Sequence, residues 1–337
     1  MDVDFVVLWV DGSDPEWLKE KNKYQSAGLE KASTDAKRFR DWDVMKYWFR
    51  AVDQYAPWVR KVHFVTWGHL PPFLNRDAPK LHIVNHEDFL PDEFRPTFSS
   101  HTLELNLWRI QGLSECFVYF NDDVFINRPT AKSDFFDEKT HLPRMHFFEM
   151  PIRFYDYAAI QTQPMVTGTG LINKHFDKRK IPLSKMPGKY LSMKYPFSDN
   201  IRSLFMKLLF PNYYVGFRQY HGPAVLTLDT YREIWGKEEE LMLRTSRNRF
   251  RVYQDPNIWS FLFWQLASGK FAPKKNGNKF YNLDETTIDT VCSDIEHHAY
   301  ETLCINDAYS GEDFDRMRAK LQDAFEKTLP EKCSFEL

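Results

Sequence analysis

Two short, uninterrupted apolar stretches stand out in the first part of the chain, and each leads into acidic residues. The first covers residues 4–10 (DFVVLWV) and is followed by the polar segment DGSDP. The second covers residues 117–120 (FVYF) and runs directly into NDD at 121–123. Apolar runs of this length, bounded by turn residues, are typical of strands that are buried on both faces. We therefore predict two interior strands, each ending in a polar turn.

The segments between these strands alternate between helical and extended patterns. Apolar residues at helical spacing predict helices that begin near Pro15 and that cover residues 43–55 and 102–110. Shorter apolar runs predict strands at residues 62–66 and 81–84. The order strand, helix, strand, strand, helix, strand is typical of an α/β fold in which helices cover a mostly parallel sheet.

The pattern is looser between residues 130 and 220, which are rich in prolines, aromatic residues and cations. We interpret this part as an insertion, with a helix near residues 201–209 that we expect to be buried. Residues 202–211 could instead rest on a membrane surface, because their apolar run carries two cations. Beyond residue 220, the pattern predicts helices over residues 221–240, 255–267 and 311–328.

The composition excludes several classes of protein. A formal net charge of −2 over 337 residues gives no electrostatic attraction for nucleic acid. The four cysteines include no CxxC pair, so neither a zinc site nor a disulfide framework is indicated, and we expect reduced thiols. No apolar run approaches the roughly 20 residues needed to cross a bilayer, and the acidic start MDVD does not resemble a secretory signal. We therefore expect a cytoplasmic protein.

The adjacent carboxylates Asp122 and Asp123 are the strongest chemical signal in the sequence. Ligands of open α/β sheets bind at the carboxyl ends of the strands, where these two residues are predicted to lie. Two neighbouring anions repel each other unless a positive charge holds them, and Mg²⁺ or Mn²⁺ bound to a phosphate would supply that charge. The alternative interpretation is a simple Asp-rich turn. The sequence has neither a glycine-rich dinucleotide motif nor a P-loop, so a nucleotide would have to be held in another way.

Two further clusters could bind a phosphorylated ligand. Gly12 would allow a ligand to approach the backbone closely, and Asp11 could accept a hydrogen bond from a ribose, although an Asx turn explains the same residues. Arg38 and Arg40, with Arg50 downstream, offer guanidinium groups that match phosphate oxygens. The solvated start of a helix is the simpler interpretation of these arginines.

Two later clusters could supply a base and further charged groups. His221 precedes a Gly-Pro pair and so cannot lie comfortably within a helix, and histidine is a natural general base near neutral pH. A structural role is nevertheless the commoner one for a lone histidine. Arg251 ends an arginine-rich run (TSRNRFR) that could neutralise developing negative charge, and Asp307 could either add an oxygen ligand or form a turn. Together these groups fit phosphoryl transfer from a diphosphate donor.

These segments, taken in order, resemble the Stealth family of polysaccharide phosphotransferases, which includes bacterial capsule enzymes and the animal lysosomal GlcNAc-phosphotransferase. Four blocks carry the resemblance: residues 4–15; residues 38–41 with 55–66, 96–104 and 119–129; residues 221–223 with 245–251; and residues 304–307. Leu8 departs from a commoner Thr, which could alter the donor pocket. The chain also lacks the long insertions of the animal relatives, so the resemblance does not extend to recognition of folded protein acceptors.

The resemblance implies a glycosyltransferase-A-like nucleotide-binding sandwich of the α/β class, with a mostly parallel sheet and helical insertions. It implies transfer of a sugar-1-phosphate from a nucleotide diphosphate sugar, UDP-linked in our expectation, to a glycan hydroxyl, with release of UMP. Mg²⁺ or Mn²⁺ is the expected cofactor. On this basis we assign His221, Arg251 and Asp123 to catalysis, Asp122, Asp123 and Asp307 to the metal, and Trp9, Asp11, Gly12, Arg38, Arg40 and Arg50 to the donor.

We accordingly divide the chain into a nucleotide-sugar-binding α/β half (residues 1–130), an acceptor-facing insertion (131–220) and the remaining catalytic part with its closing helices (221–337). The expected partners are a nucleotide sugar and a glycan or lipid-linked oligosaccharide acceptor, with peripheral contact to the inner face of the membrane. Two alternatives stay open at this point. One is a metal-dependent glycosyltransferase that releases UDP, and the other is a non-catalytic module that binds glycans.

Overall fold

The centre of the molecule is a five-stranded sheet. The computed structural model describes residues 1–25, 40–152, 162–218 and 220–337, so the predicted donor residue Arg38 lies outside the described residues. The strand order is β3-β2-β1-β4-β7, formed by β3 (Leu81–Asn85), β2 (Val62–Thr66), β1 (Val3–Leu8), β4 (Cys116–Phe120) and β7 (Ala224–Thr227). The first four strands are parallel, and β7 runs antiparallel to β4. The prediction of an α/β fold with a mostly parallel sheet is therefore confirmed.

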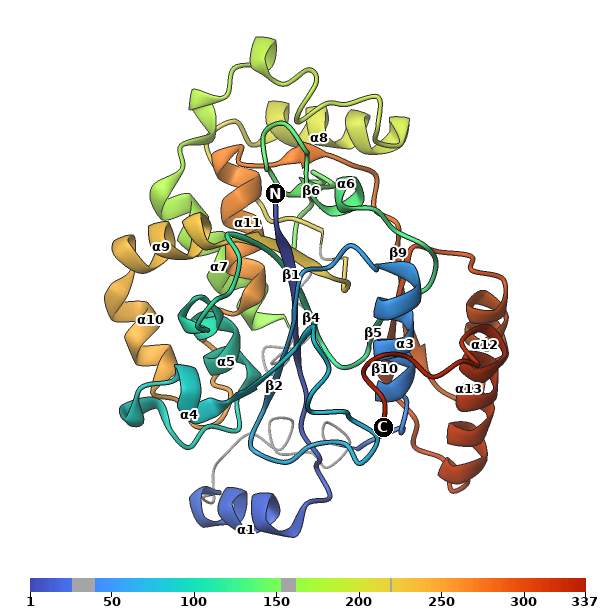
Figure 1. Ribbon diagram of the computed structural model, residues 1–337. Coiled ribbons are helices and arrows are strands. Elements are labelled where there is room, and N and C mark those ends of the chain that lie inside the picture. The colour runs from blue at the N-terminus through green and yellow to red at the C-terminus, as the bar shows by residue number, and fades with distance from the viewer. Residues whose placement is uncertain (26–39, 153–161, 219) are drawn as a thin grey trace.

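Helices cover both faces of this sheet, as Figure 1 shows. The longer helices are α1 (Pro15–Tyr24), α3 (Met45–Tyr55), α5 (Ser100–Asn106), α7 (Gln163–His175), α8 (Phe197–Leu209), α9 (Leu228–Lys237), α10 (Glu239–Ser246), α11 (Ile258–Ser268), α12 (Ile288–Glu296) and α13 (Phe314–Thr328). Short ones are α4 (His86–Phe89), α6 (Lys132–Phe135) and the 3-10 turns Asp92–Phe94, Leu107–Arg109, Lys178–Lys180 and Leu183–Lys185. Smaller sheets pair β5 (Val124–Ile126) with β10 (Thr302–Asp307) and β9 (Asn278–Leu283), and β6 (Arg144–Met145) with β8 (Ala272–Pro273).

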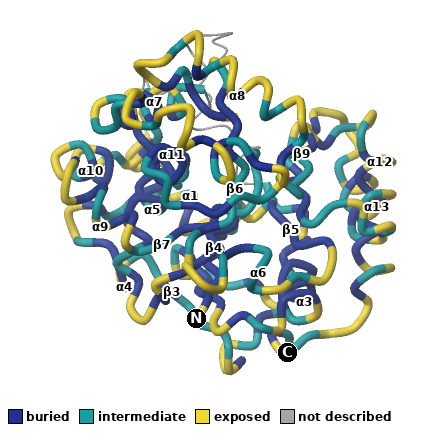
Figure 2. The backbone as a smooth tube through the Cα atoms, turned by 90° about the horizontal axis from the view of Figure 1, so that it is seen from above, coloured by how far each residue is buried: buried dark blue, intermediate teal, exposed yellow. Residues whose placement is uncertain are grey.

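Alternating side chains of β1 fill two separate cores. Val3, Phe5 and Val7 pack on the face that α3 and α13 cover, whereas Val6 and Leu8 pack on the face that α5 and α11 cover. Successive side chains of a strand point to opposite faces, so a strand buried on both sides is apolar at nearly every position, and Asp4 is the exception in β1. This requirement explains the two uninterrupted apolar runs in the sequence. The buried path of these central strands is visible in Figure 2.

The order of the strands also determines where a ligand can bind. The chain passes from β1 to β2 and β3 on one side, and then returns to place β4 on the other side of β1. Connections that leave in opposite directions open a crevice at the carboxyl ends of the two central strands. The carboxyl ends of β1 and β4 are followed by residues 9–12 and 121–123, respectively.

Two predictions about the later part of the chain are corrected. The helix predicted over residues 221–240 begins only at Leu228, because residues 224–227 (AVLT) form β7 and pair with β4. The helix near residues 201–209 exists as α8, but the expectation that it is buried was wrong. Only Ser203 and Lys207 of this helix are buried, so its apolar residues face outward.

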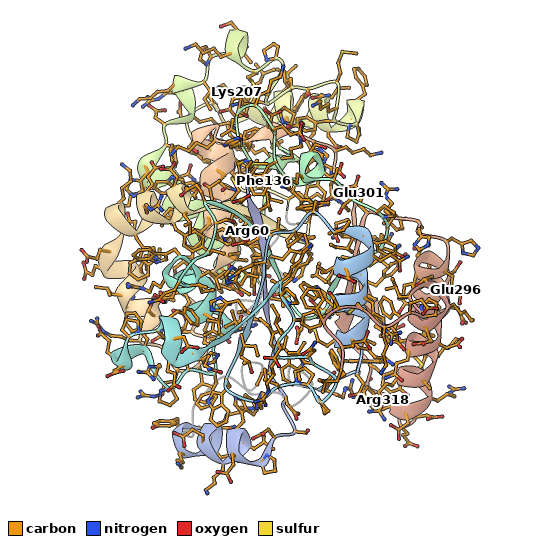
Figure 3. The ribbon with its side chains drawn as sticks, viewed as in Figure 1. Arg60, Phe136, Lys207, Glu296, Glu301 and Arg318 are labelled. Carbon is orange, nitrogen blue, oxygen red and sulfur yellow. The ribbon has the colours of Figure 1, made fainter. Side chains whose placement is uncertain are left out.

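One buried charge cluster ties β1 to its neighbours. Asp4 is fully buried and accepts hydrogen bonds from Arg60, whose position beside β1 is labelled in Figure 3, from the ring of His63, and from the backbone N–H of Ser114. Burial alone would raise the pKa of Asp4, but the hydrogen bonds from His63, Arg60 and Ser114 outweigh it and lower the pKa to about 2. The ionised form of Asp4 therefore stabilises the fold.

The first prediction concerns the Asp4→Asn variant. Because the folded pKa lies below the ordinary value of 3.8, the stabilisation is present above pH 4 and is lost as the pH falls toward 2. We expect the substitution to lower the free energy of unfolding at pH 7 by about 2–3 kcal/mol. Denaturant unfolding should show this difference shrinking between pH 4 and pH 2. Asp2→Asn, at an exposed neighbour, serves as the control, and a loss independent of pH would contradict the assignment.

Candidate functional site

The predicted acidic motif lies at the carboxyl ends of the central strands β1 and β4. Val7 of β1 pairs with Phe120 of β4, so the two chains leave the sheet side by side. After β4, a tight turn in which the N–H of Val124 bonds to the carbonyl of Asn121 at 3.1 Å presents Asp122 and Asp123. The main-chain carbonyl of Asp123 accepts a hydrogen bond from the N–H of Ile305 at 2.8 Å. The turn is therefore clamped between the main sheet and β10.

Asp123 has one oxygen that the protein leaves without a partner. Its Oδ2 accepts a weak hydrogen bond from the Cys304 thiol at 3.4 Å, whereas its Oδ1 is buried and has no hydrogen-bond partner. A buried carboxylate oxygen without a partner is costly, and natural structures keep one where another group is to bind. This oxygen points to a missing positive ligand or proton donor.

Both carboxyl groups of the pair have raised pKa values. Burial is the main cause at Asp122, with the charges of Asp123 and Asp41 adding to it, and the pKa rises to about 7. The side chain of Asp122 keeps contact with solvent although many protein atoms surround it. Burial also raises the pKa of Asp123, and the nearby charge of His221 acts in the opposite direction. The site thus concentrates negative charge that its surroundings only partly compensate.

Asp41 and Asp11 extend this acidic region. Burial raises the pKa of Asp41, and the charges of Asp43 and Asp11 add to the effect, while a hydrogen bond from the Trp9 side chain opposes it. Trp9 and Asp11 were predicted from the sequence to contact the donor, whereas Asp41 was not among the predicted site residues. The structure brings Asp41 close enough to Asp122 for the two charges to interact.

The loop after β1 is held in a defined shape. The N–H of Asp11 donates to Nε2 of His69 at 2.7 Å, and burial lowers the pKa of His69, which suits a neutral, accepting ring. Asp11 also accepts hydrogen bonds from Ser13, as the Asx-turn interpretation predicted, and Asp14 caps α1 by accepting from the N–H of Trp17. No motif in the sequence indicates that His69 contacts this loop, because His69 follows β2 whereas the loop follows β1.

His221 reaches the same edge of the sheet from β7. The antiparallel pairing of Tyr119 with Ala224 brings the start of β7 beside the end of β4, and His221, three residues before β7, lies close enough to Asp123 for their charges to interact. Its ring packs against Trp259 and Phe280 at centroid distances of 5.4 and 5.1 Å, and its main-chain carbonyl accepts from the Asn278 amide at 2.5 Å. The imidazole is therefore fixed by packing on both sides.

Burial lowers the pKa of His221, and the charge of Arg251 lowers it further, whereas Asp123 raises it. The net direction is downward, so the ring is neutral at pH 7 and able to accept a proton. The nearby carboxylate would stabilise the imidazolium formed. This combination suits a general base.

Arg251 completes the group and rests on a buried network that sequence reasoning missed. Its Nη2 donates to the Ser100 hydroxyl at 2.7 Å, and that hydroxyl donates to Oε1 of Glu104 at 3.0 Å. Burial lowers the pKa of Arg251, and the charges of Glu104, Tyr119 and Asp122 oppose that effect. Glu104 is also held by the N–H of Ile258 at 2.9 Å. Glu104 lies on the apolar side of the helix predicted over residues 102–110. A carboxylate in that position is the sequence feature that could have indicated this network.

Three predicted site residues are engaged elsewhere. Both oxygens of Asp307 bind the Arg40 guanidinium, at 2.7 and 2.5 Å, so both are engaged in an ion pair within the protein. Arg40 also donates to the carbonyl of Tyr309, and its fork is therefore used within the protein. Arg50 is buried and pairs with Glu336 at 2.7 and 3.0 Å, which places it in the core beside α13 and not at a donor phosphate. A charged residue in a sequence does not reveal which distant partner neutralises it.

A cavity of about 130 Å³ is lined by Tyr220 and Gly222, the two chain neighbours of His221, and we call it the cavity beside His221. Its lining includes His146, Arg218, Tyr220, Lys274 and Asn276. The ring of His146 is stacked between Tyr195 and Tyr220 at centroid distances of 4.7 and 5.2 Å, and burial lowers its pKa to about 4. Stacked rings and amide or cationic groups are suited to binding a hydrated ring such as a sugar.

A larger cavity of about 510 Å³ lies at the opposite edge of the sheet. Arg60, Ser114 and Cys116 line it, and they precede or begin their strands, so it is remote from the acidic turn. Size therefore does not identify the functional cavity, whereas strand direction does.

The acidic turn fits a divalent cation only together with a phosphorylated ligand. Within the described ranges, no group of three or more His, Cys, Asp or Glu residues is arranged to hold a metal ion. Asp122 and Asp123 nevertheless offer hard oxygen donors, one of them the unpartnered Oδ1 of Asp123. Mg²⁺ commonly binds through one or two carboxylates, with phosphates and waters completing its coordination. The residues present fit that pattern.

Comparison with known proteins gives consistent matches along the chain. Residues 1–28 match Stealth protein conserved region 1 (CR1), and residues 38–143 match Stealth protein conserved region 2 (CR2). The capsular polysaccharide phosphotransferase WcwK of Streptococcus pneumoniae is 38% identical over 339 residues, which cover 99% of this chain and 98% of that protein. The receptor polysaccharide phosphotransferase WefC of Streptococcus oralis is 35% identical over 342 residues, covering 99% of each.

A third relative is the exopolysaccharide phosphotransferase cps2G of Lactiplantibacillus plantarum, which is 36% identical over 340 residues and covers 99% of this chain and 96% of that protein. Among solved structures, the galactosyltransferase LgtC in complex with donor and acceptor sugar analogs aligns over 95% of both chains, with 12% identity and a TM-score of 0.38.

The second prediction uses the charge repulsion in the acidic turn. In the presence of EDTA, we expect Asp122→Asn to raise the melting temperature by about 1–3 °C, because it removes one of several crowded like charges. Addition of excess Mn²⁺ with pyrophosphate should raise the melting temperature of the wild-type protein but not of this variant. Asp315→Asn, 85% exposed on α13, is the matched control. An unchanged response to Mn²⁺ in Asp122→Asn would contradict the proposed role of the turn.

Proposed function

The chain belongs to the Stealth family, and we propose that it transfers a sugar-1-phosphate from a UDP-linked sugar to a glycan hydroxyl during capsule or cell-surface polysaccharide synthesis. The observation that carries this proposal is the meeting of four side chains at one edge of the sheet. Asp122 and Asp123 arrive from β4, His221 from β7, and Arg251 from the segment after α10. These groups come from distant parts of the sequence and have no shared structural task that would explain their proximity.

The donor is proposed to lie across the ends of β1 and β4. Trp9, Asp11 and Gly12 form the loop after β1 and would contact the nucleoside. Mg²⁺ or Mn²⁺ held by Asp122 and Asp123 would supply positive charge to the two donor phosphates. The crowded negative charge of the turn supports this arrangement, because a cation with its phosphates would relieve it.

The proposed reaction is a substitution at the phosphorus that carries the sugar. The acceptor oxygen forms a bond to this phosphorus, and the bond from the same phosphorus to the bridging oxygen breaks, so that UMP leaves with that oxygen. His221 takes the proton of the acceptor hydroxyl, and Asp123 stabilises the resulting imidazolium. Asp122 or Asp123 is the competing candidate for the base. Arg251 neutralises charge on the phosphoryl oxygens, a role that its fixed contact with Ser100 supports.

The acceptor is proposed to enter through the cavity beside His221. Tyr220 and Gly222, on either side of this histidine in sequence, both line that cavity. Its stacked rings and its amide and cationic groups suit a saccharide.

The cellular location of the enzyme is a separate part of the proposal. No helix in the described part of the chain is long and apolar enough to cross a membrane. We propose that the enzyme works in the cytoplasm, on a lipid-linked acceptor at the inner membrane face.

A glycosyltransferase, the first alternative function, would instead direct the acceptor to the anomeric carbon and release UDP. A non-catalytic glycan-binding module would have no use for a base beside a carboxylate pair.

The third prediction tests the reaction and its base together. With a panel of UDP-sugars, Mn²⁺ and a capsule-type oligosaccharide, we expect release of UMP, measured by chromatography. His221→Ala should reduce kcat by about 10²–10⁴-fold, because removal of a general base has effects of that size. His297→Ala, at an exposed position at the C-terminal end of α12, is the control.

Two results would count against this scheme. Release of UDP would favour the glycosyltransferase alternative, and a near-normal rate in a folded His221→Ala protein would show that another group is the base.

The fourth prediction concerns the acceptor cavity. Tyr220→Ala removes a ring that stacks on His146, and we expect it to raise the KM for the acceptor about tenfold while leaving the KM for the donor unchanged. Tyr220→Phe keeps the ring and should behave nearly like the wild-type protein. Equal changes in both KM values would argue against a separate acceptor site.

A further inference from the structure

Helix α8 (Phe197–Leu209) is amphipathic, but its apolar side faces solvent and its polar side is buried. Its two buried residues are polar, Ser203 and Lys207. Its apolar residues face solvent, with 79% of Phe197 and 57% of both Phe205 and Leu208 exposed. A helix on the surface of a globular protein normally turns its apolar side inward, and α8 does the opposite.

The exposed apolar surface extends beyond the helix itself. Among the described residues, nine of the fourteen exposed large hydrophobic side chains lie between residues 183 and 213. We call these nine the α8 surface: Leu183, Met193, Phe197, Ile201, Leu204, Phe205, Leu208, Leu209 and Tyr213. Scattered hydrophobic residues are normal on protein surfaces, but a concentration of this kind marks a site of interaction. Figure 2 shows α8 at the edge of the molecule with exposed stretches along it.

The reversed orientation is fixed by buried polar contacts. The Lys178 ammonium binds Glu149 at 2.7 Å and also donates to the carbonyls of Met206 and Phe210 at the end of α8. Lys207, labelled in Figure 3, donates to the carbonyl of Lys178 at 2.6 Å. Rotating the helix to bury its apolar side would leave these buried charges without partners, which is strongly unfavourable.

The surroundings of the α8 surface are strongly basic. Residues 177–218 contain nine Lys or Arg, two Asp and no Glu, a formal charge of +7, whereas the whole chain carries −2. The exposed cations include Arg179, Lys180, Lys185, Lys194 and Arg202. A second copy of the chain would bring an equal positive charge against this one, which argues against a dimer through this face. A bilayer with anionic headgroups matches both the charge and the apolar side chains.

We propose that the α8 surface docks the protein onto an anionic lipid bilayer, with the apolar side chains inserted at the headgroup boundary and the cations against lipid phosphates. The helix also adjoins the cavity beside His221. Asp199 of α8 lies 3.2 Å from His146, and Arg202 lies over the ring of Phe148. Resting on the proposed function, docking would bring this cavity to the glycan of a lipid-linked acceptor.

The test is co-sedimentation of the full chain with vesicles of phosphatidylglycerol and phosphatidylcholine, compared with vesicles of phosphatidylcholine alone. The wild-type protein should bind the anionic vesicles, and added salt should weaken the binding. The double variant Phe205→Ser, Leu208→Ser should reduce the bound fraction at least tenfold. Lys185→Glu with Lys194→Glu should remove the preference for anionic vesicles. Leu337→Ser, 72% exposed but outside the surface, is the matched control.

Several outcomes would overturn the proposal. These are no binding to anionic vesicles, equal binding to neutral ones, or wild-type binding by the serine double variant. A wild-type dimer in analytical ultracentrifugation that the serine variant abolishes, without vesicle binding, would assign the surface to a second copy. Melting temperature and UMP release with a water-soluble acceptor verify that the variants fold. Because vesicle binding is measured without substrates, a failed transfer assay beside intact binding would reject the proposed function alone.

Discussion

The accumulation of negative charge at the ends of β1 and β4 is the constraint on which the site depends. Asp41, Asp122 and Asp123 lie close together and partly enclosed, and their ionised forms are disfavoured. A protein selected only for stability would replace one of them, because enclosed like charges cost free energy. Arg251 and His221 provide only partial compensation. The remaining deficit of positive charge is the basis for our proposal that the turn binds a cation together with phosphates.

The arginine side chains around the carboxylate pair are held in place by hydrogen bonds and ion pairs with other residues of the protein. Glu104 lies beneath Ser100 and Arg251, and a backbone N–H of α11 holds its second oxygen. The Arg40–Asp307 pair similarly connects the segment before α3 with the end of β10. These contacts cross long distances in the sequence. They turn a sheet and two helical layers into one rigid frame around the carboxylate pair.

Much of the central sheet could be predicted from the sequence, because burial on both faces demands uninterrupted apolar runs such as FVVL and FVYF. The acids that follow these runs were recognisable for the same reason. The incorrect predictions share one physical cause, which is contact with residues that are far away in the sequence. AVLT at 224–227 has no strong local preference and becomes a strand because β4 offers an open edge. Arg50 was predicted to contact a donor phosphate, but its charge is neutralised by Glu336, which is far away in the sequence. The outward apolar side of α8 is set by buried lysines that no local periodicity reveals.

The antiparallel return of β7 has a consequence for how this enzyme could diversify. The proposed base, His221, precedes β7 and the acids follow β4, and these two strands are hydrogen-bonded to each other, so the sheet limits how far the groups can move apart. Loops that reach toward the sugar or the glycan can then lengthen, shorten or change composition without disturbing the reacting groups. Such a division would let one scaffold serve many chemically different surface polymers.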